Sequence, residues 1–368
     1  MIASASGSSI GQVVICGAGV IGTSIAYHLA KLGVTSVTVI DPVGLAPAAS
    51  GKAGGFLALD WNPGPLDELS RRSFYLHEKL AEELNLDETC YRRLSCEAVA
   101  IDGSSTRPSQ KKLHNVQWAD IGVLGSQCMG TTETIAQTHP RTFVEAMWKE
   151  AERMGCSLRL GTVKDVVIDD IIDESKHKKK CSGIILNDGD QVTADVVIVA
   201  MGPWSSNLPS IDIPTMYGQK YHSAILRPER ILNQAVFFQG LGDPEVYPRP
   251  DGDVYVCGFP DPPTIVTEKP GQVEVRPDAV DRLIDVAGKV SSELASAEVS
   301  REKCSSCYLP IVGNGLPLIG PMPNLQGAYV ATGHSCWGIL NAPATGEAMA
   351  ELIVNGKTTH VDLTNFKP

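Results

Sequence analysis

The distribution of apolar and polar residues at the start of the chain is that of a strand, a helix and a second strand. Residues 13–16 form a short apolar run, and a glycine-rich turn follows them. Apolar residues then recur at helical spacing up to a terminating glycine: Ile21, Ile25, Leu29, Leu32 and Gly33. A second apolar run covers residues 37–40 and ends at Asp41. The pattern predicts a βαβ unit.

The periodicity of the remaining chain predicts further helices and strands. Helices are expected over 66–86, 140–155, 277–297 and 342–354. Strands are expected over 94–101, 157–160, 163–168, 184–186, 196–199, 235–239 and 253–258, with more before Thr332. Two segments are expected to lie outside such elements: 102–134 as loops, and the lysine-rich stretch 173–180 as the solvated tip of a hairpin.

Composition narrows the class of protein. Of the 368 residues, 43% are hydrophobic and 20% are charged, which is typical of a globular protein that buries a large core. The formal net charge of -11 argues against nucleic acid as a partner. No apolar run approaches the roughly 20 residues that span a bilayer, so no membrane span is expected.

Cysteine usage and the first residues bear on the compartment. Ten cysteines without framework spacing predict free thiols and a reducing environment. We therefore expect a soluble intracellular protein, in the cytoplasm or inside an organelle such as a plastid or a mitochondrion. The Ser-rich residues 1–9 are expected to form a disordered tail, with the stub of a trimmed organelle transit peptide as the alternative.

Three glycines in the first predicted turn match a dinucleotide-binding fingerprint. Gly17 allows the tight turn, Gly19 lets the backbone approach a pyrophosphate, and Gly22 lets the helix pack closely on the strand. Asp41, at the end of the second strand, lies where an acid would accept hydrogen bonds from ribose hydroxyls. No arginine follows it, which disfavours NADP and leaves NAD and FAD. The cofactor-binding residues predicted here are Gly17, Ala18, Gly19, Val20, Ile21, Gly22, Asp41 and Pro42.

Two further motifs favour FAD over NAD. Residues 49–55 follow the second strand, and Ser50 and Lys52 can reach a pyrophosphate, although a flexible glycine loop is the alternative. Residues 333–338 precede the last predicted helix, whose N-terminus would stabilise negative charge on a reduced flavin. These motifs add to the predicted site Ser50, Gly51, Lys52, Ala53, Gly54, Gly55, Gly333, His334, Cys336, Trp337, Gly338 and Ile339.

With Thr138-His139-Pro140 and the segments 194–204, 315–320 and 333–346, these motifs resemble the FAD-dependent D-amino-acid oxidase superfamily, which includes glycine and sarcosine oxidases. Their order and spacing match over nearly the whole chain. Ser-Gly-Lys-Ala-Gly-Gly and Gly-His-Ser-Cys-Trp-Gly are most similar to a fungal and plant subfamily of FAD-dependent oxidoreductases. The resemblance implies an α/β fold in which a doubly wound, Rossmann-like FAD-binding domain is interleaved with an antiparallel-sheet substrate domain.

The resemblance also implies domain limits and roles for single residues. The FAD-binding domain would comprise 1–88, 139–212 and 304–368, and the substrate domain 89–138 and 213–303. Asp41 would bind the adenosine ribose, Val163 the adenine through its backbone, and residues 54–55 with 334–339 the isoalloxazine. The residues expected to flank the dinucleotide are Ala200, Gly202 and Trp204.

The reaction implied by the resemblance is hydride transfer from a small amine or amino-acid-like substrate to flavin N5, with molecular oxygen or an electron carrier reoxidising the flavin. One departure bears on the substrate. Leu309 stands where the family's amino-acid oxidases carry an arginine for the substrate carboxylate, and leucine cannot replace it. Either another cation serves, for which Arg249 is the candidate, or the substrate is no simple amino acid.

The candidate catalytic residues are Arg249, Tyr247 and Trp337. A structural ion pair is the alternative for Arg249, and strand packing is the alternative for Tyr247 and for Tyr255. Cys307 matches the cysteine through which sarcosine oxidase binds flavin covalently, and a buried strand thiol is its alternative. No motif completes a metal site around it, so no metal is predicted.

Two rival functions stay open at this point. One is a non-catalytic protein that FAD stabilises and that acts in assembly or sorting, which the leucine at position 309 favours. The other is an NAD-dependent dehydrogenase, in which the motif at 333–338 would have no purpose.

Overall fold

A parallel six-stranded sheet forms the centre of the computed structural model, which describes residues 10–109, 113, 115–173 and 176–368. The tail predicted for residues 1–9 lies outside the described chain. The strand order is β19-β21-β12-β1-β2-β8, and only β19 runs antiparallel to its neighbour. The strands are β1 (Val13–Cys16), β2 (Val37–Asp41), β8 (Ser157–Leu160), β12 (Val196–Val199), β19 (Leu318–Pro321) and β21 (Ala328–Thr332).

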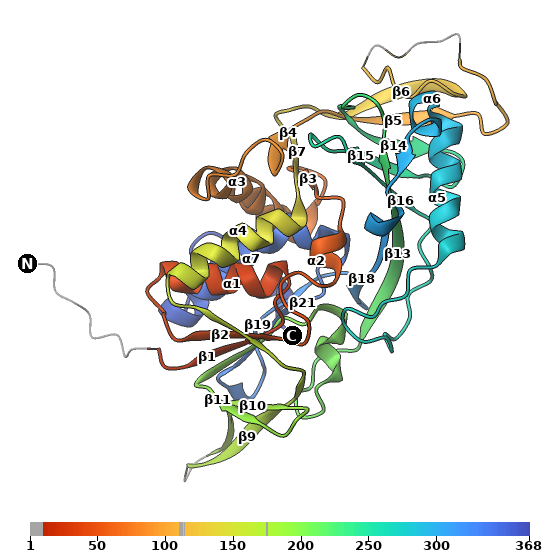
Figure 1. Cartoon of the computed structure of the whole chain (residues 1–368). Helices are drawn as coiled ribbons and strands as arrows, with labels where there is room; N and C mark the ends of the chain where they lie inside the picture. The colour runs from red at the N-terminus through yellow and green to blue at the C-terminus, as the bar shows by residue number, and fades with distance from the viewer. Residues whose placement is uncertain (1–9, 110–112, 114, 174–175) are drawn as a thin grey trace, which may run out of the picture.

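Both faces of this sheet are covered, which is why its strands are apolar runs without alternation. Helices lie on one face and a small sheet of β9, β10, β11 and β20 on the other (Figure 1). In β1, Val13 and Ile15 join the core under the helices, whereas Val14 and Cys16 join the opposite core. The covering elements are α1 (Val20–Lys31), α3 (Asp67–Glu83), α4 (Pro140–Arg153), α7 (Gly338–Asn355), β9 (Val163–Asp173), β10 (Lys176–Leu186), β11 (Gln191–Thr193) and β20 (Leu325–Gln326).

A second large sheet of eight mainly antiparallel strands lies beside the first layer (Figure 1). Its order is β17-β13-β16-β15-β14-β5-β6, and β18 also pairs with β13. Helix α5 packs on it through Leu283 and Ala287. The elements are β5 (Cys96–Ile101), β6 (Val123–Gly130), β13 (Met216–Arg227), β14 (Ala235–Gln239), β15 (Glu245–Pro248), β16 (Val254–Gly258), β17 (Glu298–Val299), β18 (Ser305–Val312), α5 (Pro277–Val290) and α6 (Ser292–Ala295).

Short elements connect the two large sheets. A three-stranded sheet has the order β3-β7-β4. Its strands and the remaining short helices are β3 (Phe56–Ala58), β4 (Tyr91–Arg93), β7 (Ile135–Thr138), α2 (Ala49–Lys52) and the 3₁₀ helices η1 (Gly64–Leu66), η2 (Gly202–Asn207), η3 (Arg301–Lys303), η4 (Ser335–Trp337) and η5 (Thr364–Phe366). The predicted fold class, a doubly wound α/β layer with an antiparallel-sheet region, is confirmed.

Several element limits predicted from periodicity are wrong. Residues 102–134 were expected to be loops, yet β6 lies there, because pairing with β5 supplies backbone partners that local sequence does not reveal. The helix expected over 277–297 breaks at Ser291, which is extended and whose hydroxyl caps Leu294 N–H. The last helix begins at Gly338, not at 342. Strand β10 extends into the segment expected to be a hairpin tip, with Lys176 opposite Asp173.

The domain limits stay a prediction. Sheet membership departs from them at β18, which pairs with β13 along its whole length and therefore lies in the eight-stranded sheet. The ten cysteines are all free thiols, as predicted.

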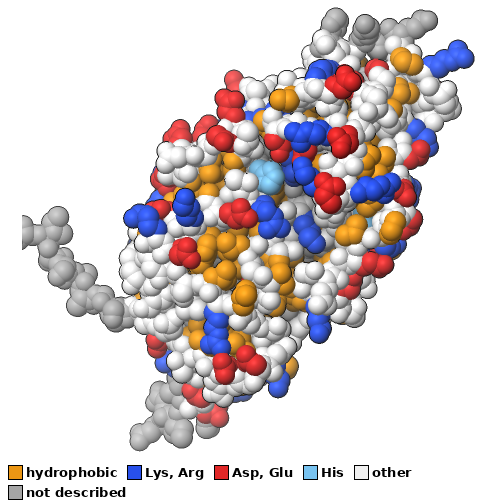
Figure 2. All heavy atoms as spheres, viewed as in Figure 1, with side chains coloured by type: hydrophobic (Ala, Val, Ile, Leu, Met, Phe, Trp, Pro, Cys, Tyr) orange, Lys and Arg blue, Asp and Glu red, His pale blue; other side chains and the backbone are white. Residues whose placement is uncertain are grey.

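The outer surface carries both charge signs. On the face seen in Figure 2, acidic and basic side chains are interspersed in spite of the net charge of -11. None of the helices in the described residues combines the length with the apolar character that a bilayer-spanning segment requires.

Helices α1 and α7 pack at close range through small residues. A Cβ at Gly346 of α7 would lie 2.7 Å from the carbonyl carbon and oxygen of Ser24 in α1, which backbone atoms cannot avoid. On the other side of α7, the side-chain oxygen Oδ1 of Asn341 accepts a hydrogen bond from the Ser70 hydroxyl of α3 at 3.0 Å. Gly346 therefore sets how closely the last helix approaches the βαβ unit.

Replacing Gly346 with alanine is expected to destabilise the protein by about 1–3 kcal/mol, because overpacking outweighs the higher helix propensity of alanine. Urea unfolding followed by circular dichroism measures the change. Gly288→Ala in α5 is the matched control, since its Cβ would meet Ala295 at an ordinary 3.4 Å. The close-packing argument is wrong if both variants are as stable as the parent.

Candidate cofactor-binding and active site

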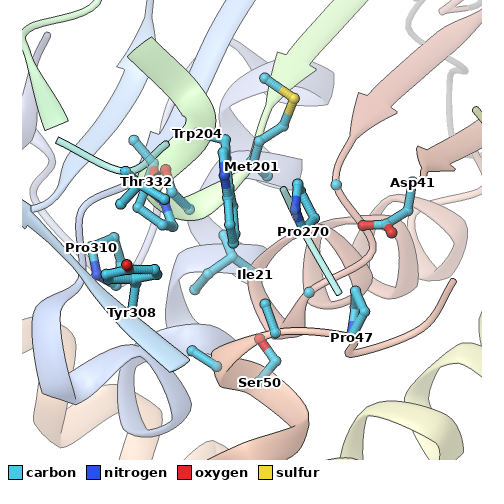
Figure 3. Close-up of a pocket in the computed structure, with 18 of the residues that line it drawn as sticks. Ile21, Asp41, Pro47, Ser50, Met201, Trp204, Pro270, Tyr308, Pro310 and Thr332 are labelled. Carbon is cyan, nitrogen blue, oxygen red and sulfur yellow. Dashed lines mark hydrogen bonds between the residues drawn. The ribbon is translucent and has the colours of Figure 1, made fainter. Parts of the chain in front are cut away.

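A cavity of about 590 Å³ opens where the carboxyl ends of β1 and β2 meet. This is the switch point of the doubly wound sheet, because β12 and β2 flank β1 on opposite sides. Figure 3 shows Asp41 and Tyr308 on opposite sides of the cavity, with Ile21 and Trp204 between them. Its size is that of sites that bind small molecules and cofactors.

The glycine turn between β1 and α1 has no room for side chains. Gly17 has φ +109, and a Cβ there would lie 2.9 Å from the carbonyl carbon of Ala200. A Cβ at Gly22 would overlap with the Gly17 carbonyl oxygen. The backbone N–H of Val20 donates to Ser50 Oγ at 2.9 Å. The first-turn amides of α1, which have no carbonyl partner within the helix, border the cavity and suit an anionic group.

Asp41 has one function in the fold and capacity for another. Its side chain is 6% exposed and accepts three backbone hydrogen bonds: from Ala18 N–H at 3.0 Å, Val43 N–H at 2.9 Å and Gly44 N–H at 3.1 Å. It thus connects the glycine turn with the segment that follows β2. A carboxylate accepts about four hydrogen bonds, so Asp41, which lines the cavity, can accept one more from a ligand.

The opposite end of the cavity is bordered by η4 and the start of α7. His334 is 4% exposed, its Nε2 lies 3.1 Å from Thr345 Oγ1, and burial lowers its pKa to about 3, so the ring is neutral. Gly338 and Ile339, in the first turn of α7, also line the cavity. Their helix terminus stabilises negative charge nearby.

His77 of α3 holds this first turn from behind. Its Nε2–H donates to the carbonyl oxygens of Ile339 at 2.9 Å and Leu340 at 3.2 Å. The ring is completely buried, and burial lowers the pKa of His77 to about 4. A neutral His77 therefore positions the end of α7 that borders the cavity.

The structure brings most of the predicted cofactor residues to the cavity wall. Those that line it are Gly17, Gly19, Val20, Ile21, Asp41, Pro42, Ser50, Ala53, Val163, Ala200, Gly202, Trp204, Gly333, His334, Cys336, Gly338 and Ile339. Those that do not are Ala18, Gly22, Gly51, Lys52, Gly54, Gly55 and Trp337. Several of these support the wall from behind: Lys52 Nζ, for example, donates to Ser306 O of β18 at 3.0 Å.

The three predicted catalytic residues lie beyond the cavity wall. Tyr247 is buried and its hydroxyl donates to Glu245. The guanidinium of Arg249 lies 5.5 Å from the ring centroid of Tyr255, and its Nη2 donates to Ala53 O at 3.1 Å. Arg249 forms no ion pair with a carboxylate among the described contacts, so the structural ion pair is not formed there, and its role toward a substrate stays a prediction. Trp337 contacts Trp61 edge-on at a centroid distance of 6.4 Å.

A segment that the sequence analysis missed covers the cavity. We call residues 266–272 the strap. Glu268 in it accepts hydrogen bonds from the Lys220 ammonium at 3.2 Å and from the Tyr308 hydroxyl, and its carbonyl accepts from Trp204 Nε1–H at 2.9 Å. The strap has neither helix nor strand periodicity, so no sequence signal could have found it. Its cavity-lining residues are Val266, Thr267, Glu268, Lys269, Pro270 and Gln272.

These features fit a dinucleotide. A glycine turn without room for a Cβ, the residual acceptor capacity of Asp41 and helix N-termini on two sides are what a pyrophosphate-linked ligand requires. Leu309 lines the same cavity, and Lys269 of the strap is the basic residue among the described lining residues. The wall therefore lacks the arginine that would hold a carboxylate.

Comparisons with known proteins agree with this geometry. The family model described as DAO, FAD dependent oxidoreductase, matches residues 12–352. A Schizosaccharomyces pombe protein named as an oxidoreductase is 29% identical, over 97% of this chain and 97% of its own length. The glycine oxidase of Bacillus licheniformis is 26% identical, over 97% and 96%. The crystal structure of Geobacillus kaustophilus glycine oxidase shares the fold, with a TM-score of 0.77, 22% identity and 97% coverage of each chain.

Acid is expected to destabilise the protein through its buried histidines. Below about pH 6.5 the unfolded chain binds a proton at residue 77, whereas folded His77 stays neutral down to about pH 4. Stability therefore falls as the pH drops through this window, by about 1.4 kcal/mol per pH unit for each such histidine. Urea unfolding at pH 7.5 and 5.5 measures the loss. His77→Gln should show a smaller loss than the parent, and the exposed control His360→Gln the same loss; equal slopes for all three contradict the argument.

Proposed function

Because the chain belongs to the DAO family of FAD-dependent oxidoreductases, we propose that it oxidises a small amine or amino-acid-like molecule by hydride transfer to flavin N5. FAD is the cofactor of this family, which removes the NAD-dependent alternative. The observation that carries the proposal is the cavity at the sheet's switch point, with a glycine turn and Asp41 on one side and the first turn of α7 on the other. Bound FAD supplies the hydride acceptor.

The residues proposed to hold FAD are those of the cavity wall. First-turn amides of α1 and Ser50 would bind the pyrophosphate, and Asp41 the adenosine ribose. The start of α7 would favour negative charge on the flavin ring. The strap and Trp204 are hydrogen-bonded to each other and line the cavity, where they would exclude water from the reacting groups.

The proposal leaves two electron acceptors, molecular oxygen or an electron carrier. We expect the protein to act inside the cell. The non-catalytic alternative also keeps one observation in its favour, because Leu309 removes the arginine that pairs with carboxylate substrates in the resembling oxidases. A turnover experiment separates the two functions.

Anaerobic mixing of the FAD-loaded protein with primary, secondary and tertiary amines and with glycine or sarcosine is expected to bleach the visible flavin band with at least one amine. Stopped-flow absorbance measures the rate. If the protein is fully loaded with FAD and none of these compounds bleaches its flavin band, the non-catalytic function is favoured.

The lining position of Leu309 gives a second readout of the same reaction. Leu309→Arg is expected to raise the rate of flavin bleaching with glycine or sarcosine relative to alkylamines, because a guanidinium binds carboxylates. Leu309→Met is the size-matched control and should leave this ratio close to that of the parent. An unchanged ratio in Leu309→Arg argues that position 309 does not face the substrate.

The flavin is expected to be bound without a covalent bond. Cys307 is 6% exposed, its side chain does not line the cavity, and burial raises its pKa to about 11. A thiol that keeps its proton is a poor nucleophile. Acid precipitation should therefore release all flavin absorbance into the supernatant. Flavin that stays in the pellet of the parent and not in that of Cys307→Ser would establish Cys307 as an attachment point.

A further inference from the structure

Six aromatic side chains pack together beside the cavity wall. We call Phe56, Trp61, Phe237, Tyr247, Tyr255 and Trp337 the aromatic cluster. Phe56 stacks on Tyr247 with centroids 5.4 Å apart, and Tyr247 stacks on Tyr255 at 6.0 Å. These rings come from β3, β14, β15, β16 and η4, and from the residues after β3, so only the folded chain assembles them.

The aromatic cluster packs against residues that are next to the cavity wall in the chain. A Cβ at Gly54 would lie 3.1 Å from the ring of Tyr255 and would overlap with the ring of Tyr247. On the other side, Trp337 follows Cys336, which lines the cavity. Four of the rings, those of Phe56, Trp61, Phe237 and Trp337, are only half-buried, so part of their surface remains accessible. These accessible parts offer ring faces to a small molecule bound beside the cavity.

A carboxylate, that of Glu245, contacts one of these rings through a hydrogen bond. Glu245 of β15 is half-buried and accepts hydrogen bonds from the Tyr247 hydroxyl and from Cys257 Sγ at 3.6 Å. Both donors are neutral, and no basic side chain of the described residues pairs with Glu245. Burial raises the pKa of this carboxyl. An anion held in such surroundings gains stability when a cation joins it.

Three basic side chains of this region have partners other than Glu245. Arg249 stacks against Tyr255 and donates to Ala53 O. Lys52 donates to Ser306 O, and Lys220 pairs with Glu268 of the strap at 3.2 Å. Position 309 holds leucine, so nothing basic comes from that side of the cavity. The carboxylate of Glu245 is therefore left for a cationic ligand to pair with.

We propose that the protein recognises its substrate as a small organic ammonium ion without a carboxylate, held between Glu245 and the ring faces of the aromatic cluster. This inference rests on the proposed function and names its substrate class. Aromatic faces attract ammonium groups through their quadrupole, most strongly when the ion leaves water, and a carboxylate adds a direct charge partner. An amino acid would bring its own carboxylate toward Glu245, where like charges repel.

Calorimetric titration of the FAD-loaded protein with three small probes tests this. Tetramethylammonium is the cation, tert-butanol its neutral counterpart and pivalate its anionic counterpart of similar shape. Tetramethylammonium is expected to bind at least about tenfold more tightly than either of the others. Equal affinities, or tighter binding of pivalate, overturn the proposal.

Variants identify the groups responsible. Glu245→Gln is expected to weaken tetramethylammonium binding at least about tenfold and to leave tert-butanol binding unchanged. Phe237→Leu should weaken it severalfold by removing one ring face. The control Glu302→Gln removes an equal charge from the exposed helix η3 and should leave it unchanged. If Glu245→Gln fails to fold, the comparison of the three probes on the parent still decides the question.

The outcomes also separate this inference from the proposed function. Selective tetramethylammonium binding, lost in Glu245→Gln, in a protein whose flavin no amine bleaches would overturn the oxidase function alone and support the ammonium site. Flavin bleaching by glycine or sarcosine, without selective binding of tetramethylammonium, would overturn the ammonium site and support the oxidase function.

Discussion

The contact between the glycine turn and the end of β12 is the constraint on which the rest of the site depends. Gly17 N–H donates to Ile40 O at 2.7 Å, and Ala200 N–H donates to Cys16 O at 2.8 Å, so the ends of three parallel strands are fixed against one another. Any side chain at position 17 would push the segment after β12 away. Because Gly202 and Trp204 follow directly, the roof of the cavity depends on the same contact.

The sequence predicts those features of the site that depend on residues close to one another in the chain. The βαβ unit, its three glycines and Asp41 follow from periodicity and from a turn that tolerates no Cβ. The strap could not be predicted, because its Glu268 is held by hydrogen bonds from Lys220 and Tyr308, which are remote in sequence. The role of Glu245 could not be predicted for the same reason. Its surroundings are aromatic rings from other strands, which only the folded chain brings beside it.

Residues that are close in sequence within β15 and β18 differ in their surroundings. In β18, Tyr308 and Leu309 line the cavity, whereas the buried Cys307 does not. In β15, Glu245 and Tyr247 lie on the same face of the strand, since side chains alternate. The eight-stranded sheet thus presents one polar pair to an otherwise aromatic surface.

Helix α7 is a late segment of the chain, yet its first turn completes the cavity and its small residues pack on α1, the first helix. A chain that ends before residue 338 would therefore lack part of the cavity wall as well as the helix that packs on α1. Because a ligand stabilises only the state that binds it, such a product would gain less stability from a molecule in the cavity than the finished chain would.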